Sequence, residues 1–165
     1  MLGSIFVSKV VFFIMKQFSG NLSSLFCLFA LFLVLDTAAQ NEYTSSVPKA
    51  IRNFESAIQF YDARKNKEAL ESIDQALKED SKFVEAYMLR ANIYSDMKNH
   101  DKAIEAYNEA IRLSPDFFPN NYFSLAKSEY LAGRFGDAKI HYQKFLSYPK
   151  IKASLASNAK QMVEN

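Results

Sequence analysis

Cysteine and histidine are scarce in this sequence. Cys27 is the single cysteine, so neither an intramolecular disulfide nor a cluster of metal-bound thiolates can form. The two histidines, His100 and His141, lie far apart and lack the short spacing of a metal site. The four glycines and four prolines are too few for a turn-rich β architecture. These shortages predict a helical protein without a metal centre.

Charge of one sign is also missing. The formal net charge is only +2, and the lysines and arginines are interspersed with acidic residues, as in residues 62–68. A nucleic-acid partner usually requires a clustered basic face, so none is expected here. Mixed charge runs of this kind are typical of helix faces exposed to solvent.

Motifs that carry chemistry are absent as well. No glycine-rich nucleotide loop and no G-x-S-x-G elbow occurs, so we expect neither a cofactor nor an enzyme. His100 is interpreted as a packing residue beside a turn. His141 is expected on the outer face of its helix, in contact with solvent.

The N-terminus contains an unbroken apolar run over residues 25–35. A run of 11 residues is too short to cross a bilayer, which needs about 20, but it fits the apolar core of a secretory signal. Small residues follow, so the prediction is a signal peptide over residues 1–39, cleaved after Ala39, with Met15 as an alternative start. A linker is expected over residues 40–48.

An uncleaved anchor is the alternative for this region. It would use both apolar stretches, residues 5–15 and 22–35, although the polar residues between them argue against one continuous span. Either interpretation predicts export, to the periplasm or the periphery of an outer membrane.

The remainder of the chain is internally repetitive. Three sets of positions recur 34 and then 35 residues apart: Ala57, Ala91 and Ala126; Ala69, Ala103 and Ala138; and Ile73, Tyr107 and Tyr142. Apolar residues within each unit follow the spacing of two amphipathic helices. The alanines would let helices approach closely, and the larger residues would fill the holes beside them. Tight turns are expected at Asn66, Asn99 and Gly133.

The 34-residue period and these residue classes resemble the tetratricopeptide repeat family. The resemblance implies an all-α solenoid of three helix-turn-helix repeats, over residues 50–83, 84–118 and 119–148. A capping helix would follow over residues 149–165, covering the third repeat with Ile151, Leu155, Ala159 and Val163. The residues at signature positions of the family are Ala57, Ala69, Ala91, Ala103, Tyr107, Pro115, Ala126, Gly133, Ala138 and Tyr142.

A narrower resemblance concerns the third repeat. The runs at residues 115–126, 133–138 and 144–149 are similar to the repeat region that opens certain bacterial OmpA-like envelope proteins. This similarity implies a place in the cell envelope, in association with the outer membrane or other envelope proteins. The alternative is that the chain is a fragment of a larger OmpA-like, peptidoglycan-associated protein.

Resemblance to the repeat family also implies a function, the binding of a partner protein or peptide in the concave face lined by the first helix of each repeat. We expect a non-catalytic scaffold, with the alternative for each groove residue that it packs against neighbouring helices. A carboxylate clamp is not expected, because Phe54, Ile58, Asn120 and Ser124 fill the corresponding positions. The predicted groove residues are Phe54, Ile58, Tyr61, Met88, Asn92, Asp96, Phe123, Lys127 and Tyr130.

Overall fold

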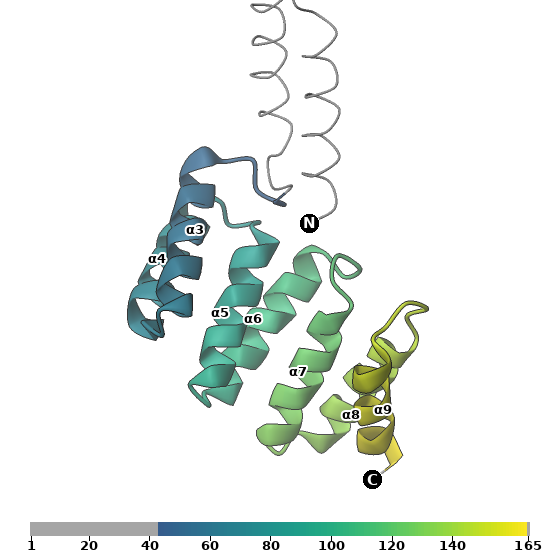
Figure 1. The fold of residues 1–165 in the computed structure, drawn as a ribbon. Coiled ribbons are helices and arrows are strands. Elements are labelled where there is room, and N and C mark those ends of the chain that lie inside the picture. The colour runs from purple at the N-terminus through teal and green to yellow at the C-terminus, as the bar shows by residue number, and fades with distance from the viewer. Residues whose placement is uncertain (1–42, 165) are drawn as a thin grey trace, which may run out of the picture. The chain divides into compact units, whose positions relative to one another are not determined.

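The described part of the chain is built from helices. The computed structural model describes residues 43–164, which belong to a unit running from Tyr43 to Asn165. The predicted signal peptide, its cleavage site and the start of the predicted linker lie outside the described residues. Residues 43–164 contain no strand and form seven helices (Figure 1): α3 (Pro48–Asp62), α4 (Asn66–Glu79), α5 (Val84–Asp96), α6 (His100–Leu113), α7 (Asn120–Leu131), α8 (Phe135–Leu146) and α9 (Ala153–Glu164).

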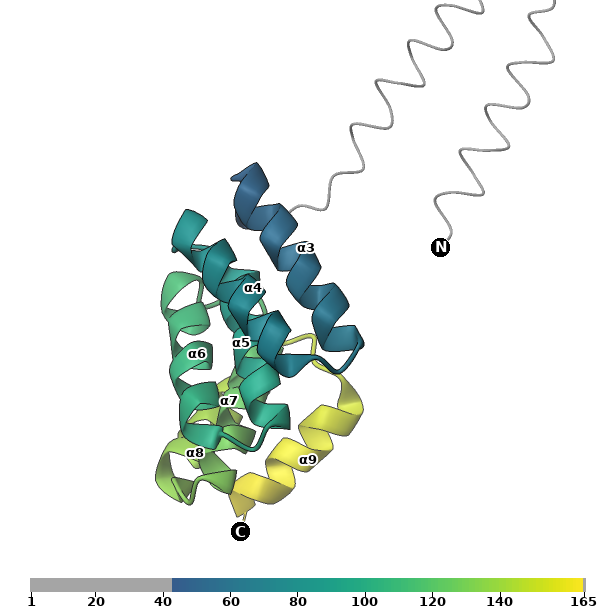
Figure 2. The same cartoon turned by 90° about the vertical axis from the view of Figure 1, so that its left-hand side faces the viewer.

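These helices form three consecutive pairs followed by a single helix. Helix α3 packs against α4, α5 against α6 and α7 against α8, and α6 also packs against α7. The first residues of α3, α5, α7 and α9 lie at one edge of the unit, and the turns within the pairs lie at the opposite edge (Figure 1). Turning the molecule places α4, α6 and α8 on one side and α3 on the other (Figure 2). This arrangement confirms the predicted helical-repeat solenoid.

Alanine recurs where neighbouring helices approach one another. Each of the six repeated alanines is at most 2% exposed, and Pro115 directly follows the second pair, whose last helix ends at Leu113. The large residues beside the alanines, Ile73, Tyr107 and Tyr142, are also buried. Small side chains facing large ones allow an interior to reach native packing density, which explains why these positions repeat together.

One residue in the turn of each pair has left-handed backbone geometry. The residues are Arg64 (φ 62°), Lys98 (φ 58°) and Gly133 (φ 78°), which occupy equivalent repeat positions. Only glycine adopts this geometry without a penalty from its Cβ atom. The structure corrects two predicted turn positions, since Asn66 is the first residue of α4 and the Asn99 side chain caps α6.

Part of the predicted linker over residues 40–48 packs on the repeats. The Thr44 hydroxyl oxygen accepts a hydrogen bond from the Val84 N–H at 3.0 Å, which caps the start of α5. Phe83, the residue preceding that helix, provides no side-chain cap. The rings of Tyr43 and Phe83 also meet edge-to-face, with centroids 5.8 Å apart. This segment therefore joins the first helix pair to the second.

Helix α9 covers the open flank of the third pair. Its Ala159 is buried, and Ile151, Leu155 and Val163 pack against the cluster formed by α7 and α8. An end repeat otherwise leaves one apolar face in water, which explains why a capping helix follows the last pair.

Candidate binding groove

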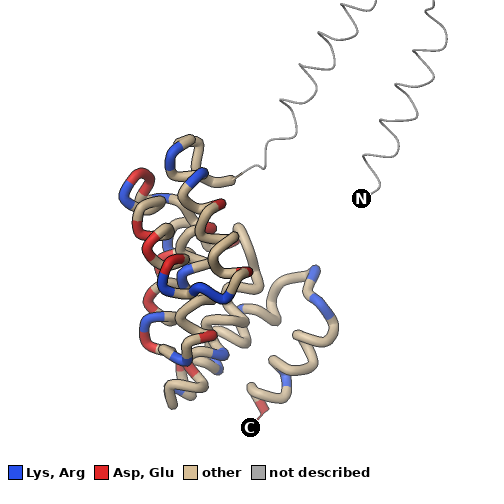
Figure 3. Tube along the Cα trace, turned by 60° about the vertical axis from the view of Figure 1, so that its left-hand side comes forward, with Lys and Arg blue, Asp and Glu red and all other residues tan. Residues whose placement is uncertain are grey.

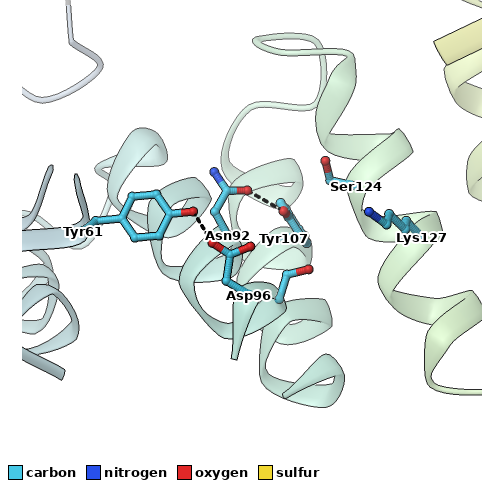
Figure 4. A pocket seen from close by; sticks show the side chains of 7 residues that line it. Tyr61, Asn92, Asp96, Tyr107, Ser124 and Lys127 are labelled. Carbon is cyan, nitrogen blue, oxygen red and sulfur yellow. Dashed lines mark hydrogen bonds between the residues drawn. The ribbon is translucent and has the colours of Figure 1, made fainter. Parts of the chain in front are cut away.

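A small pocket lies on the face formed by the first helices of the pairs (Figure 4). It has a volume of about 180 Å³ and opens to solvent. Helix α3 contributes one lining residue, α5 three, α6 one and α7 two, so all three pairs meet here. The lining residues are Tyr61, Asn92, Ser95, Asp96, Tyr107, Ser124 and Lys127.

Two tyrosine hydroxyls hold the polar side chains of α5 in place. The Tyr61 hydroxyl donates to Asp96 Oδ2 and the Tyr107 hydroxyl donates to Asn92 Oδ1, each at 2.6 Å (Figure 4). Burial and the hydrogen bond to Asp96 raise the pKa of Tyr61 to about 12. Burial likewise raises the pKa of Tyr107 to about 12. Both phenols therefore remain protonated donors at neutral pH.

These bonds leave a defined set of groups for a ligand. Because Asn92 Oδ1 accepts from Tyr107, the side-chain amide of Asn92 is oriented to donate. Lys127, an exposed residue of α7, brings a second donor, and Ser124 brings a hydroxyl from one turn earlier. The second oxygen of Asp96 can still accept. The pocket thus offers paired donors and one acceptor, as an extended peptide main chain requires.

Four of the predicted groove residues come together in this pocket. They are Tyr61, Asn92, Asp96 and Lys127, from three different helices. The sequence analysis did not assign Ser95, Tyr107 or Ser124 to the groove. Ser95 could have been found from its spacing of three residues after Asn92, one helical turn along the same face.

Phe54 requires a correction. It was predicted to face the groove, but it is only 5% exposed and its ring packs against those of Tyr43 and Phe83. Periodicity placed Phe54 on the inward face, but it could not show that the segment before α3 would fold back and cover it.

The remaining predicted groove residues lie outside the pocket. Ile58 packs against the first core cluster, and Phe123 contacts the rings of Tyr142 and Phe145. Met88 is half-buried. Tyr130 is exposed and stacks on the ring of Phe135, beside the turn between α7 and α8. These residues border the polar pocket rather than form it.

The structure also corrects the position expected for His141. Its Nδ1 lies 2.7 Å from Glu129 Oε2, and Glu129 is 3% exposed. His141 is therefore half-buried and paired with a buried carboxyl group instead of being fully in solvent. His100, expected to be a packing residue, is half-buried at the start of α6.

Charges of both signs are mixed along the described helices (Figure 3). Arg134 pairs with Asp101 at 2.6 Å across the second and third pairs, and Lys49 pairs with Glu79 at 2.8 Å within the first. No described helix has the length and apolarity needed to span a bilayer. Within residues 43–164, no group of three potential metal ligands gathers in one place.

Comparisons with known proteins agree with this architecture. Residues 84–117 match the tetratricopeptide repeat family. The first TPR domain of Spaghetti (RPAP3), solved with the HSP90 peptide SRMEEVD, has a TM-score of 0.66 at 17% identity, covering 72% of this chain and 94% of that one. The second TPR domain of human RPAP3, solved with the HSP70 peptide SGPTIEEVD, has a TM-score of 0.63 at 16% identity, covering 69% and 94%. The Arabidopsis OM64 TPR domain has a TM-score of 0.65 at 12% identity, covering 73% and 98%. No curated protein matched the sequence.

The described part of the chain is therefore an all-helical solenoid of the tetratricopeptide type. Its second helix pair, α5 with α6, is a tetratricopeptide repeat. Domains of this class are typically scaffolds for protein–protein interaction, and their ligands include peptides.

Proposed function

We propose that this protein is a non-catalytic scaffold that binds an extended segment of a partner protein in the groove centred on Asn92. The observation that supports the proposal most directly is the pocket itself, where donors from α5 and α7 converge on an open face. The peptide-bound state of two similar solved domains agrees with such a role.

The expected ligand chemistry follows from the pocket residues. Asn92 would hold the main chain of the segment, because its oriented amide group can donate to a peptide carbonyl. Lys127 and Asp96 have opposite charges, so a ligand with many charges of one sign would be repelled by one of them. Phe54 and Ile58 leave α3 without a cation on this face, so a strongly acidic C-terminus is not the expected ligand.

Selection from a displayed library of random peptides on the full-length protein tests the proposal. We expect Asn92→Ala and Lys127→Ala each to weaken the selected peptides by about tenfold, equivalent to about 1.4 kcal/mol and near the net value of one hydrogen bond. Asn108→Ala and Lys139→Ala are matched controls at exposed positions outside the pocket, and they should leave affinity unchanged. Equal effects at all four positions would refute the groove assignment.

We further propose that the scaffold is exported and acts in the bacterial cell envelope, on the basis of the apolar run over residues 25–35 and the small residues after it. N-terminal sequencing of the protein from fractionated cells tests this step. Protein that begins at Gln40 in the periplasmic fraction is the expected result. Protein that retains Met1 or Met15 in the membrane fraction would support the anchored alternative, and uncleaved protein in the cytoplasm would refute export.

A further inference from the structure

Two adjacent phenylalanines are exposed on the connection between α6 and α7. Phe117 is 43% and Phe118 is 44% exposed. Phe118 follows Phe83 by 35 residues and has the equivalent place before its helix, yet Phe83 is fully buried. The difference arises because the rings of Tyr43 and Phe54 cover Phe83, with centroids 5.8 and 4.7 Å away.

The connection that carries these phenylalanines is held in place. The Tyr148 hydroxyl donates to Asp116 Oδ1 at 2.6 Å, which ties the connection to the segment between α8 and α9. Pro115 and Pro119 flank the phenylalanine pair and restrict its backbone. The pair is thus presented on a restrained loop, where the cost of ordering it for binding is low.

Lysines lie on the neighbouring segment of the same edge. Residues 147–163 contain Lys150, Lys152 and Lys160 and no acidic residue, and Lys150 and Lys152 are exposed. The connections before α5, α7 and α9 all lie at this edge (Figure 1). It therefore combines exposed aromatic side chains with nearby cations, a combination typical of surfaces that contact lipid headgroups.

The chain also enters the described unit at this edge, since Thr44 bonds to the first residue of α5. The apolar run ends at Leu35, and the seven residues between it and Tyr43 span at most about 25 Å when extended. An apolar run held in a bilayer would therefore keep this edge near the membrane.

We propose that this edge rests on a lipid bilayer, with Phe117 and Phe118 entering the interfacial layer and Lys150 and Lys152 contacting anionic headgroups. The opposite edge carries Phe135, which is 60% exposed, but the chain does not enter there. This membrane-facing edge is separate from the Asn92 pocket, so the proposal does not depend on peptide binding.

The absence of tryptophan from the chain allows a direct test. The full-length protein would be reconstituted with phosphatidylcholine and phosphatidylglycerol vesicles that contain brominated lipid, which quenches tryptophan within the bilayer. We expect about half of the emission of the Phe118→Trp variant to be quenched. The matched Phe135→Trp variant, at an exposed phenylalanine on the opposite edge, should not be quenched. Adding Lys150→Glu and Lys152→Glu should reduce quenching at position 118 in vesicles with phosphatidylglycerol.

Three results would overturn the proposal: no quenching of the Phe118→Trp variant, equal quenching of both variants, or a concentration-dependent blue shift without lipid. The last result would show that the edge binds a second copy of the chain. Circular dichroism would show whether each variant keeps its helices, and Phe117→Trp provides a replacement probe if Phe118→Trp does not. Peptide affinity at the groove, measured on the same variants, should be unchanged.

Discussion

The second and third helix pairs have the same fold but are stabilised differently. The second pair, α5 with α6, lies between two other pairs, whereas the third, α7 with α8, is covered on its outer side by α9. Where the second pair has Tyr94 and Ala106, the third has Glu129 and His141. A large side chain beside a small one is thus replaced by a buried ion-pairing group and its partner. The repeat geometry constrains side-chain size and spacing more strongly than it constrains polarity.

Their turns differ in the same way. The left-handed position is Lys98 in the second pair and Gly133 in the third. A non-glycine residue in this geometry costs roughly 1–2 kcal/mol, so the pair that matches the family best contains the less favourable turn. Extensive packing on both sides can compensate for such a local cost.

Removing the cap should have the largest effect on this comparison. Deletion of residues 150–165 exposes apolar side chains that contribute roughly 1.5–3 kcal/mol each as an upper estimate. We expect amide hydrogen exchange to become faster first in α7 and α8, with α5 and α6 the least affected. Full protection of α7 and α8 without the segment would show that α9 is not a cap.

Separating the polar pair of the third repeat should be the next largest effect. His141→Ala leaves the buried Glu129 without its partner and should lower the free energy of unfolding by about 3 kcal/mol. Combining it with Glu129→Tyr recreates the arrangement of the second pair and should recover most of that loss. Urea unfolding of the single and double variants measures both changes. A single variant as stable as the parent would mean that the pair contributes little.

Overpacking the second pair should have a smaller cost. Ala91 is fully buried between helices, so Ala91→Leu should destabilise the protein by roughly 1–3 kcal/mol. Glu105→Leu, at an exposed position of α6, is the control and should change the melting temperature little. An unchanged melting temperature for Ala91→Leu would contradict the repeat register.

Exchanging the turn residues should give the smallest effects, with opposite signs in the two pairs. Lys98→Gly should stabilise the protein by about 1 kcal/mol, and Gly133→Ala should destabilise it by about the same amount. A Cβ atom added to Gly133 would meet no atom within 4 Å, so backbone conformation alone should account for the loss. Thermal unfolding of both variants checks the signs, and equal signs would refute this explanation.

Much of the fold could be predicted from residue spacing. Helices that repeat every 34 or 35 residues have the same neighbours in each repeat, so Ala57, Ala91 and Ala126 had to be small wherever helices approach. The apolar spacing that begins at Ile151 likewise predicted a helix against the third pair. Such local patterns are read directly because a helix presents every third or fourth residue on one face.

The candidate site was predicted less completely. Spacing placed Phe54 and Tyr61 on the same inward face, but only Tyr61 reaches the pocket. The outcome for Phe54 depended on Tyr43, whose fold-back no periodic pattern encodes. The pairing of Glu129 with His141 was missed for a related reason, since it joins two helices across a gap of 12 residues.

The sequence by itself determined the helix pairs, their order and the small residues that let them stack, because these follow from local periodicity. Only the tertiary structure decided which polar groups meet. Tyr61, Asn92 and Lys127 belong to three helices, and their convergence depends on how the pairs stack. It also decided that Phe83 is covered and Phe118 is not. Burial depends on which segments arrive from elsewhere in the chain, so identical residues at equivalent positions can have different environments.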